Sequence, residues 1–352
     1  MKRILSLLLA VCLMLSCAAL FGGCKPEKET NDFPVTFGDV TIEQEPKAIV
    51  VLSDKLADII SYIGYDVKMV GRSEECTQEF LQVVPAVGKA SAPDIAAITA
   101  AGADLVIADN TLPEDVKQNL TAAGLKVIVM NIALNTNELG ELYENVGTVL
   151  GGKETGRAKG EKGFSTLFET LDTLNTASTK VLKTSAYLYL DQSGQLCTFV
   201  KDSLEQKFFS YNGAPNVLAD QTEPLANLDS LRIESPSFIF CDSIDVINVL
   251  QNTPGLANIK AIAEGHTLVI PKVNFERHGT SVEQAVFDML SYIEKVTKTT
   301  PDQATPDQPT AAPTQAATVA AAQPASDAPT EAQADEEYYE DQDVYTDEEV
   351  YY

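Results

Sequence analysis

The stretch PKAIVVLSDKLADIISYIGYDVKMVGRSEEC, residues 46–76, decides the fold class. Residues 48–52 are apolar and mostly β-branched, which is typical of a buried strand. Residues 56–63 then carry apolar side chains at helical spacing and stop at Gly64, a residue type that commonly follows a helix end. Residues 68–70 are expected to form the next short strand. A strand, a helix and a strand in this order predict a parallel sheet covered by helices.

The same alternation extends along the chain in both directions from a long helical middle. Residues 154–174 predict one long helix, although Gly156, Gly160 and Gly163 each lower its stability by about 1 kcal/mol relative to Ala. The sequence therefore predicts two α/β lobes, each with a mostly parallel central sheet, joined by a long helix. Strands are expected at 105–108, 126–130, 185–190, 197–200, 237–241 and 268–270, and helices at 95–101, 114–123, 138–150, 204–211 and 282–296.

The N-terminus has the pattern of a secretory signal. A basic start, Lys2 and Arg3, precedes an apolar run at 4–21 and the small residues before Cys24. This arrangement resembles the bacterial lipoprotein signal, in which the cysteine becomes the lipid-modified first residue, although Phe21 stands where the pattern usually has Leu. We expect lipidation at Cys24, and an uncleaved membrane helix is the alternative.

The charge of the chain is strongly acidic and unevenly distributed. The net charge is −26, and half of it lies in residues 301–352, which contain 13 Asp and Glu residues and no Lys or Arg. Such a balance argues against nucleic acid as a partner, because few groups are present to neutralise phosphates. Residues 301–334 are rich in Pro, Thr, Ala and Gln, so we expect disorder there. The acidic, tyrosine-containing end is either a solvated tail or a segment that binds cations or cell-surface partners.

Several segments resemble the substrate-binding lipoproteins of metal-chelate ABC importers, which take up ferric siderophores, haem or cobalamin. The resemblance covers roughly residues 46–297. It rests on the opening stretch quoted above, on VGKASAPDIAAITAAGADLVIADN (87–110), FVKDSLEQKFFSYNGAPNVLAD (199–220), ESPSFIFCDS (234–243) and NFERHGTSVEQAVFDML (274–290), and on their order. The resemblance implies two Rossmann-like lobes joined by a helix, with one ligand bound between them.

The resemblance and the sheet pattern together imply an organisation of the chain. We expect a signal peptide at 1–23, a linker at 24–46, an N-terminal lobe at 47–150, a connecting helix at 151–178, a C-terminal lobe at 179–299 and an acidic tail at 300–352. The mature protein is expected to be a lipid-anchored monomer on the outer side of the cell membrane. Its implied partners are an ABC permease with its ATPase and a small metal chelate.

Residues that follow the predicted strands are the candidates for the ligand site, because ligands bind beyond the carboxyl ends of parallel strands. Arg72, Arg277 and His278 lie in loops that match ligand loops of the family. Basic residues there would suit an anionic chelate, such as haem or a carboxylate or catecholate siderophore. His278 is either an iron ligand or an ordinary loop histidine. The full set of expected ligand contacts is Ser53, Lys55, Arg72, Glu75, Tyr189, Lys201, Asn274, Phe275, Arg277 and His278.

Two acidic residues are candidates for docking on the permease. In the family, one acidic residue on each lobe meets arginines of the permease. The second-lobe position corresponds to Asp229, whereas the first-lobe position falls on Ala96, so that Asp94 is the nearest substitute. Asp94 is equally well placed to be a helix N-cap.

Three other functions are weaker alternatives. A receptor for free zinc or manganese usually needs about three histidines and a carboxylate, and only His266 and His278 are present. No hydrolase, kinase or dinucleotide-binding motif occurs, so no enzyme and no resident cofactor is expected. A binding lipoprotein uncoupled from transport, acting as a sensor or adhesin, is suggested by the acidic tail. Cys76, Cys197 and Cys241 remain after processing, and we expect free thiols.

Overall fold

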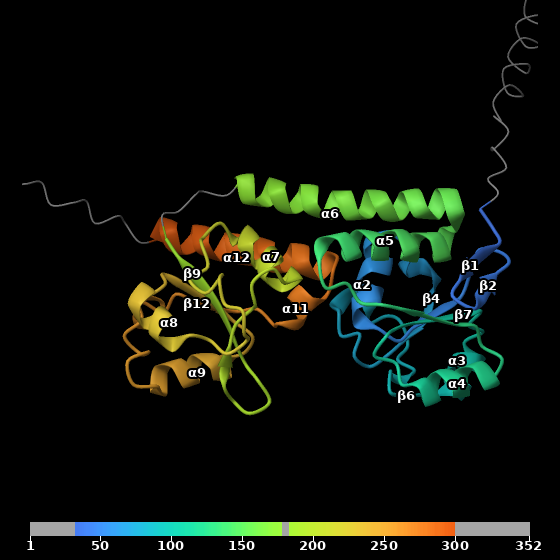
Figure 1. Cartoon of the computed structure of the whole chain (residues 1–352), viewed down its shortest axis with the longest axis horizontal. Coiled ribbons are helices and arrows are strands. Elements are labelled where there is room, and N and C mark those ends of the chain that lie inside the picture. The colour runs from blue at the N-terminus through green and yellow to red at the C-terminus, as the bar shows by residue number, and fades with distance from the viewer. Residues whose placement is uncertain (1–31, 178–182, 300–352) are drawn as a thin grey trace, which may run out of the picture. The chain divides into compact units, whose positions relative to one another are not determined.

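The first of two four-stranded sheets is entirely parallel, as the opening stretch predicts. The computed structural model describes residues 32–177 and 183–299, so the signal sequence, Cys24 and the acidic tail lie outside the described residues. The strand order is β4-β3-β7-β8 (Figure 1). The strands are β3 (Ile49–Val51), β4 (Met69–Arg72), β7 (Leu105–Asp109) and β8 (Val127–Met130). The helices of this half are α2 (Asp54–Tyr62), α3 (Ile95–Ala100), α4 (Glu114–Ala122) and α5 (Thr136–Gly151).

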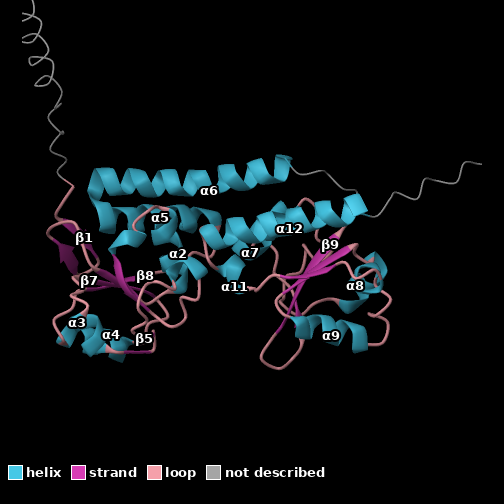
Figure 2. Ribbon diagram, turned by 180° about the vertical axis from the view of Figure 1, so that it is seen from behind, coloured by secondary structure: helices cyan, strands magenta, loops and turns pink. Residues whose placement is uncertain are grey.

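The second sheet is mixed, with the order β10-β9-β11-β12. Its strands are β9 (Ser185–Leu190), β10 (Leu196–Cys197), β11 (Phe238–Cys241) and β12 (Thr267–Val269), and only β10 runs antiparallel. The helices of this half are α7 (Leu204–Phe209), α8 (Leu228–Glu234), α9 (Ile244–Asn252), α10 (Lys260–Ala263), α11 (Val273–Glu276) and α12 (Thr280–Thr299) (Figure 2). The α/β fold with two largely parallel sheets and a long helix is therefore confirmed.

Several short elements complete the two halves. Two antiparallel pairs are formed by β1 (Val35–Phe37) with β2 (Val40–Ile42), and by β5 (Gly88–Lys89) with β6 (Ala92–Pro93). Three single-turn 3₁₀ helices are η1 (Asp66–Lys68), η2 (Glu79–Leu81) and η4 (Ser210–Asn212). The strand expected at 197–200 is shorter than predicted. It leaves the sheet after Cys197 because the amide of Thr198 donates to Pro224 instead of to β9.

The expected long helix is α6 (Arg157–Ala177), which lies alongside α5 (Figure 1). Between the two helices the chain forms one π-helical turn, η3 (Gly152–Gly156), so the predicted stretch at 154–174 is not one continuous α-helix. The carboxylate of Asp32 holds this turn by accepting from the amides of Glu154 and Thr155, at 2.8 and 2.9 Å. A residue that precedes the first sheet therefore stabilises the start of the long helix.

Glycines bring α5 and α6 into direct backbone contact. A Cβ on Gly147 or Gly156 would lie less than 3.0 Å from the carbonyl oxygen of the other residue. A Cβ on Gly160 would clash in the same way with the carbonyl oxygen of Tyr143. The glycines that weaken the helix by themselves are therefore required by its packing, because any side chain would separate the two backbones.

A buried carboxylate joins the first half of the chain to its last helix. Asp58 on α2 is fully buried, and it accepts from the hydroxyl and the amide of Ser281 in the first turn of α12, at 2.9 and 3.2 Å. Burial raises the pKa of Asp58 to about 6, and the hydrogen bonds from Ser281 only partly offset this effect. A proton on Asp58 therefore stabilises the folded state by relieving the buried charge, whereas the hydrogen bonds from Ser281 favour the carboxylate.

We predict that Gly160→Ala destabilises the protein although alanine favours helices. The gain of about 1 kcal/mol in helix propensity is smaller than the penalty for the clash with Tyr143, so a net loss of roughly 1–3 kcal/mol is expected. Gly140→Ala is the matched control, because a Cβ there would lie 3.6 Å from Phe164, an ordinary contact. Urea unfolding of both variants measures the difference. A Gly160→Ala variant as stable as the control would contradict the packing argument.

We also predict a pH dependence that belongs to Asp58. Its pKa is about 6 when folded against 3.8 ordinarily, so the folded state holds the proton more tightly. The resulting stabilisation is complete below about pH 4 and is lost as the pH rises through 6, and it amounts to roughly 3 kcal/mol. The stability of the wild type minus that of Asp58→Asn should therefore fall between pH 4 and 7. The same difference for Asp288→Asn, an exposed site on α12, should stay flat.

Candidate functional site

The strand ends of the first sheet meet the segment that follows α11 in the second half of the chain. The guanidinium of Arg277 donates to the hydroxyl of Thr77 at 2.7 Å and to the carboxylate of Asp54 at 3.3 Å. Asp54 follows β3, and Thr77 lies in the loop after β4. We call Asp54, Thr77 and Arg277 the interlobe junction. Because ligands bind beyond the carboxyl ends of parallel strands, this junction marks the candidate site.

His278 and Lys55 lie beside the junction. The His278 side chain is 3% exposed, and its ring centroid is 6.1 Å from that of Phe208 on α7. Its Nδ1 atom has no hydrogen-bond partner within the described residues. Burial, assisted by the positive charge of Lys55, lowers the pKa of His278 to about 3, so the imidazole is neutral at physiological pH. In this conformation the ring contacts protein side chains and is not open to solvent.

Arg72, at the end of β4, is occupied in holding its own loop. It is 8% exposed and donates through Nε to the carbonyl of Leu81 at 3.0 Å and through Nη2 to Gln82 at 2.9 Å. A third bond, at 3.2 Å, joins Nη1 to the carbonyl of Ser73. Arg72, which was expected to bind an anion, therefore uses its N–H groups in hydrogen bonds to Leu81, Ser73 and Gln82.

The second half presents a partly exposed aromatic and ionic group at its strand ends. Tyr189 is near the end of β9, and the Lys272 ammonium lies 5.1 Å from the centroid of its ring. Lys272 also forms an ion pair with Glu276, one helical turn further along α11. Because all three side chains keep partial exposure, they offer a cation–π and hydrogen-bonding surface to a ligand.

Phe275 belongs to the hydrophobic core, and its side chain does not reach the surface. It is fully buried, with its ring centroid 5.2 Å from those of Tyr187 and Phe199. Tyr187 and Phe199 themselves stack at 4.2 Å, with nearly parallel planes. The aromatic residue expected in the ligand loop therefore anchors α11 against the second sheet.

The remaining expected ligand residues lie at different places around the strand ends. Ser53 is buried and caps α2 by accepting from the amide of Leu56. Glu75 is exposed and accepts from the amide of Ala90. Lys201 is exposed and pairs with Asp220 at 3.4 Å, and Asn274 is half-buried on α11. Lys55, Arg277 and His278 are thus neighbours, whereas Lys201 forms its ion pair elsewhere, with Asp220.

Both candidate docking residues are exposed, and each has a local structural role. The Asp94 carboxylate caps α3 by accepting from the amide of Ala97 at 2.9 Å, which is the alternative that the sequence offered. Asp229 is in the first turn of α8, and its carboxylate pairs with Arg232 at 2.5 Å. Exposed pairs of this kind contribute little to stability, so the Asp229 carboxylate can exchange this partner for another.

The three cysteines of the body are free and buried, as expected. Burial raises the pKa of Cys76 to about 11 and that of Cys241 to about 12, so both thiols stay protonated and unreactive. Within residues 32–177 and 183–299, no three His, Cys, Asp or Glu residues cluster in a way that would hold a metal ion. No helix in these ranges combines the length and the apolar character needed to span a bilayer.

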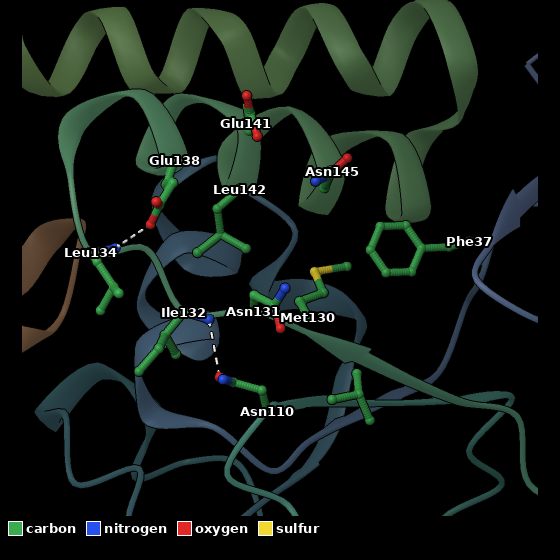
Figure 3. A pocket seen from close by; sticks show the side chains of 11 residues that line it. Phe37, Asn110, Met130, Asn131, Ile132, Leu134, Glu138, Glu141, Leu142 and Asn145 are labelled. Carbon is green, nitrogen blue, oxygen red and sulfur yellow. Dashed lines mark hydrogen bonds between the residues drawn. The ribbon is translucent and has the colours of Figure 1, made fainter.

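Two cavities are lined by β8 and its neighbours, and neither includes a residue of the interlobe junction. One, of about 640 Å³, is enclosed by the ends of β7 and β8 and by one face of α5 (Figure 3). Two of its polar side chains are engaged, since Glu138 accepts from the amide of Leu134 and Asn110 from that of Ile132. The other, of about 550 Å³, lies between β8 and the β1–β2 hairpin. Neither receives residues from the second half, so the junction is the better candidate.

Of the three junction residues, the strand-end pattern indicates Asp54 and Arg277 but not Thr77. Thr77 has no local signal, because its role depends on a residue 200 positions away. Asp58 does have one, since it is a charged residue among apolar neighbours in LADII, residues 56–60, and this is the pattern of a buried polar contact. Lys272 and Glu276 are spaced as a helical ion pair, which the sequence also displays.

Comparison with known proteins shows a consistent class of relatives. No family model matches the chain. The uncharacterized ABC transporter substrate-binding lipoprotein YvrC of Bacillus subtilis strain 168 is 24% identical over 269 residues, which cover 71% of this chain and 85% of that protein.

Solved structures of periplasmic binding proteins share the fold. The haem-binding protein RhuT of Roseiflexus sp. RS-1 matches with a TM-score of 0.55 and 17% identity, over 71% of this chain and 98% of that one. A periplasmic haem-binding protein of Pseudomonas aeruginosa gives 0.56 and 17%, over 70% and 92%. The vitamin B12-binding protein BtuF of Vibrio cholerae gives 0.50 and 18%, over 72% and 98%. The chain is therefore a sequence relative of an ABC transporter substrate-binding lipoprotein and has the two-lobed fold of these periplasmic binding proteins, which confirms the resemblance seen in its sequence.

Proposed function

We propose that this protein captures an iron chelate or a related metal–tetrapyrrole between its two lobes and delivers it to an ABC permease. The observation that carries the proposal is the interlobe junction, where Arg277 from one half of the chain bonds to Asp54 and Thr77 at the strand ends of the other. The relative from B. subtilis is a substrate-binding lipoprotein, and the solved structures bind haem or vitamin B12, as their names state.

We assign two kinds of role to the expected ligand residues. Lys55, Glu75, Tyr189, Lys201 and Asn274 keep exposed or half-exposed side chains, so they are proposed to contact the ligand. The buried residues shape the site by positioning loops and helices, because their polar atoms and rings contact the protein itself. These are Ser53, Arg72, Phe275, Arg277 and His278.

The protein is further proposed to be anchored through a lipid on Cys24, facing away from the cytoplasm. The lipoprotein signal in the sequence supports this location, and so does the lipoprotein relative. Asp32, eight positions after Cys24, is hydrogen-bonded to the first turn that leads into α6. A linker of this length spans at most about 30 Å, so the described residues stay near the membrane surface.

The proposed function predicts saturable binding of at least one chelate by the protein. Purified protein is titrated with haemin, cyanocobalamin and ferric hydroxamate complexes, and the absorbance of each chelate and the tyrosine emission of the protein are recorded. Tyr189→Ala should weaken binding about tenfold, because stacking on an aromatic ring contributes roughly 1–1.5 kcal/mol. Phe287→Ala, at a half-exposed aromatic position on α12, is the control and should bind normally. Absence of binding to every chelate would refute the proposal.

Docking predicts a specific effect of Asp229. In vesicles that contain the permease, Asp229→Ala should reduce association of the full chain several-fold at low salt, because a charge pair with a permease arginine is lost. Asp245→Ala, in the first turn of α9, is a matched exposed control that should associate like the wild type. Equal association of all three proteins would remove Asp229 from the docking surface and favour a binding protein uncoupled from transport.

A further inference from the structure

We infer that the ligand captured at the interlobe junction is electroneutral or cationic, and not an anionic chelate. This inference rests on the proposed function and names the substrate class of the same site. It reverses the expectation that basic residues in the strand-end loops select an anion. The charge that the site favours is set by the basic groups that the folded chain leaves available and by the carboxylates around them.

Both arginines of the strand-end loops already have their partners. The Arg277 side chain is 4% exposed and bonds to Asp54 and Thr77, so its charge is neutralised inside the protein. Arg72 is 8% exposed and donates to two backbone carbonyls and one side-chain amide. Freeing either guanidinium for a ligand would break these hydrogen bonds. For Arg72 it would also leave the carbonyls of Leu81 and Ser73, both buried residues, without this donor, which costs about 1–3 kcal/mol for each group. An anionic ligand therefore gains little from them.

Each lysine at the strand ends also stands next to a carboxylate. Lys272 pairs with Glu276, and Lys201 pairs with Asp220 at 3.4 Å. The Lys55 ammonium lies 3.9 Å from Asp54, which also accepts from Arg277. Among the described strand-end residues, these lysines are the remaining cations, and the net charge that each presents to a ligand is reduced by its partner.

Carboxylates outnumber the basic residues in the same loops, because seven acidic side chains, with Asp220 included, stand against the two arginines and three lysines named above. Exposed or half-exposed acidic side chains follow the strands of both sheets: Asp54, Glu74, Glu75, Asp202, Glu205 and Glu276. The body as a whole is acidic as well, with a net charge of −13 over residues 1–300. The fixed charges around the candidate site therefore favour cations over anions.

Tyr189 supplies a favourable contact for positive charge. The electron-rich face of its ring already holds the Lys272 ammonium at 5.1 Å, and the carboxylates of Glu205 and Glu276 are near enough to act on the Tyr189 hydroxyl. An aromatic face flanked by two carboxylates is suited to a cationic or neutral group and is unfavourable for a propionate, citrate or catecholate. Neutral corrinoids and neutral or cationic ferric hydroxamates fit this surface.

The test compares chelates that share a scaffold and differ in charge. The ferric complex of desferrioxamine B carries one positive charge, its N-acetyl derivative is neutral, and its N-succinyl derivative carries one negative charge. Neutral cyanocobalamin and its monocarboxylate form a second series, and dianionic haemin is the third probe. At low ionic strength we expect the cationic or neutral member of the scaffold that binds to be preferred over the anionic member by about tenfold, and the preference should shrink in high salt.

A pair of variants tests whether the carboxylates cause this preference. The double variant Glu74→Gln with Glu205→Gln should reduce the ratio of cation to anion affinity about threefold, because two charges are removed without loss of size. Glu114→Gln, in the exposed first turn of α4, is the control and should leave the ratio unchanged.

The possible outcomes distinguish the charge inference from the proposed function. Tightest binding of haemin, or of the anionic member of a series, would overturn the charge inference and leave the proposed function intact. Failure of all three scaffolds to bind would overturn the proposed function, and the charge inference with it. A cation preference that survives unchanged in the double variant would overturn the assignment of selectivity to the Glu74 and Glu205 carboxylates.

Discussion

The direct contact between the backbones of α5 and α6 is the constraint on which the rest of the structure depends. It exists because Gly147, Gly156 and Gly160 leave no side chain between the two helices, so a single methyl group at these positions would force them apart. The π-helical turn at Gly152–Gly156, held by Asp32, reverses the chain over this contact. The first half of the protein is therefore joined rigidly to the helix that leads into the second half.

This rigid join determines where the strand ends can meet. α6 carries the chain from α5 to the second sheet, and α12 then returns to pack against α2 and α6. The return is fixed by Asp58, which accepts from Ser281 at the start of α12. Arg277 and His278 immediately precede this anchored point, so they are delivered to the strand ends of the first sheet. The junction thus follows from two helix contacts that lie outside it.

The fold can be predicted from the sequence more completely than the site, and the reasons are physical. The strand at 105–108 and the helix at 114–123 were recognised because their apolar periodicity reflects local burial, and both occur within a residue or two of the expected positions. The β1–β2 hairpin, α8 and α10 were not predicted because they are short. α9 was also missed, although it is as long as α4 and clearly amphipathic. The site depends on pairs such as Arg277 and Thr77, whose distance in sequence leaves no local pattern.

The glycines at and near the start of α6 also show that local preferences cannot reveal tertiary contacts. Helix propensity correctly counts Gly156, the last residue of η3, and Gly160 in α6 as unfavourable, but it contains no information about the neighbouring helix. Their benefit appears only when Tyr143 and Gly147 are placed against them. Local preferences thus predict that α6 exists, and tertiary packing explains why its sequence departs from those preferences.

The arginines show why residue type alone does not define a ligand. A strand-end arginine has the same sequence signature whether it binds an anionic substrate or holds its own loop, because both roles need a planar donor near a sheet edge. Desolvation decides between the two roles: a buried guanidinium must already have its acceptors, whereas a ligand-binding one must keep solvent access until the ligand arrives. Arg72 and Arg277 are almost completely buried and are hydrogen-bonded within the protein, so we attribute selectivity to the exposed carboxylates and to Tyr189. The charge of the ligand is therefore governed by the groups that folding leaves exposed.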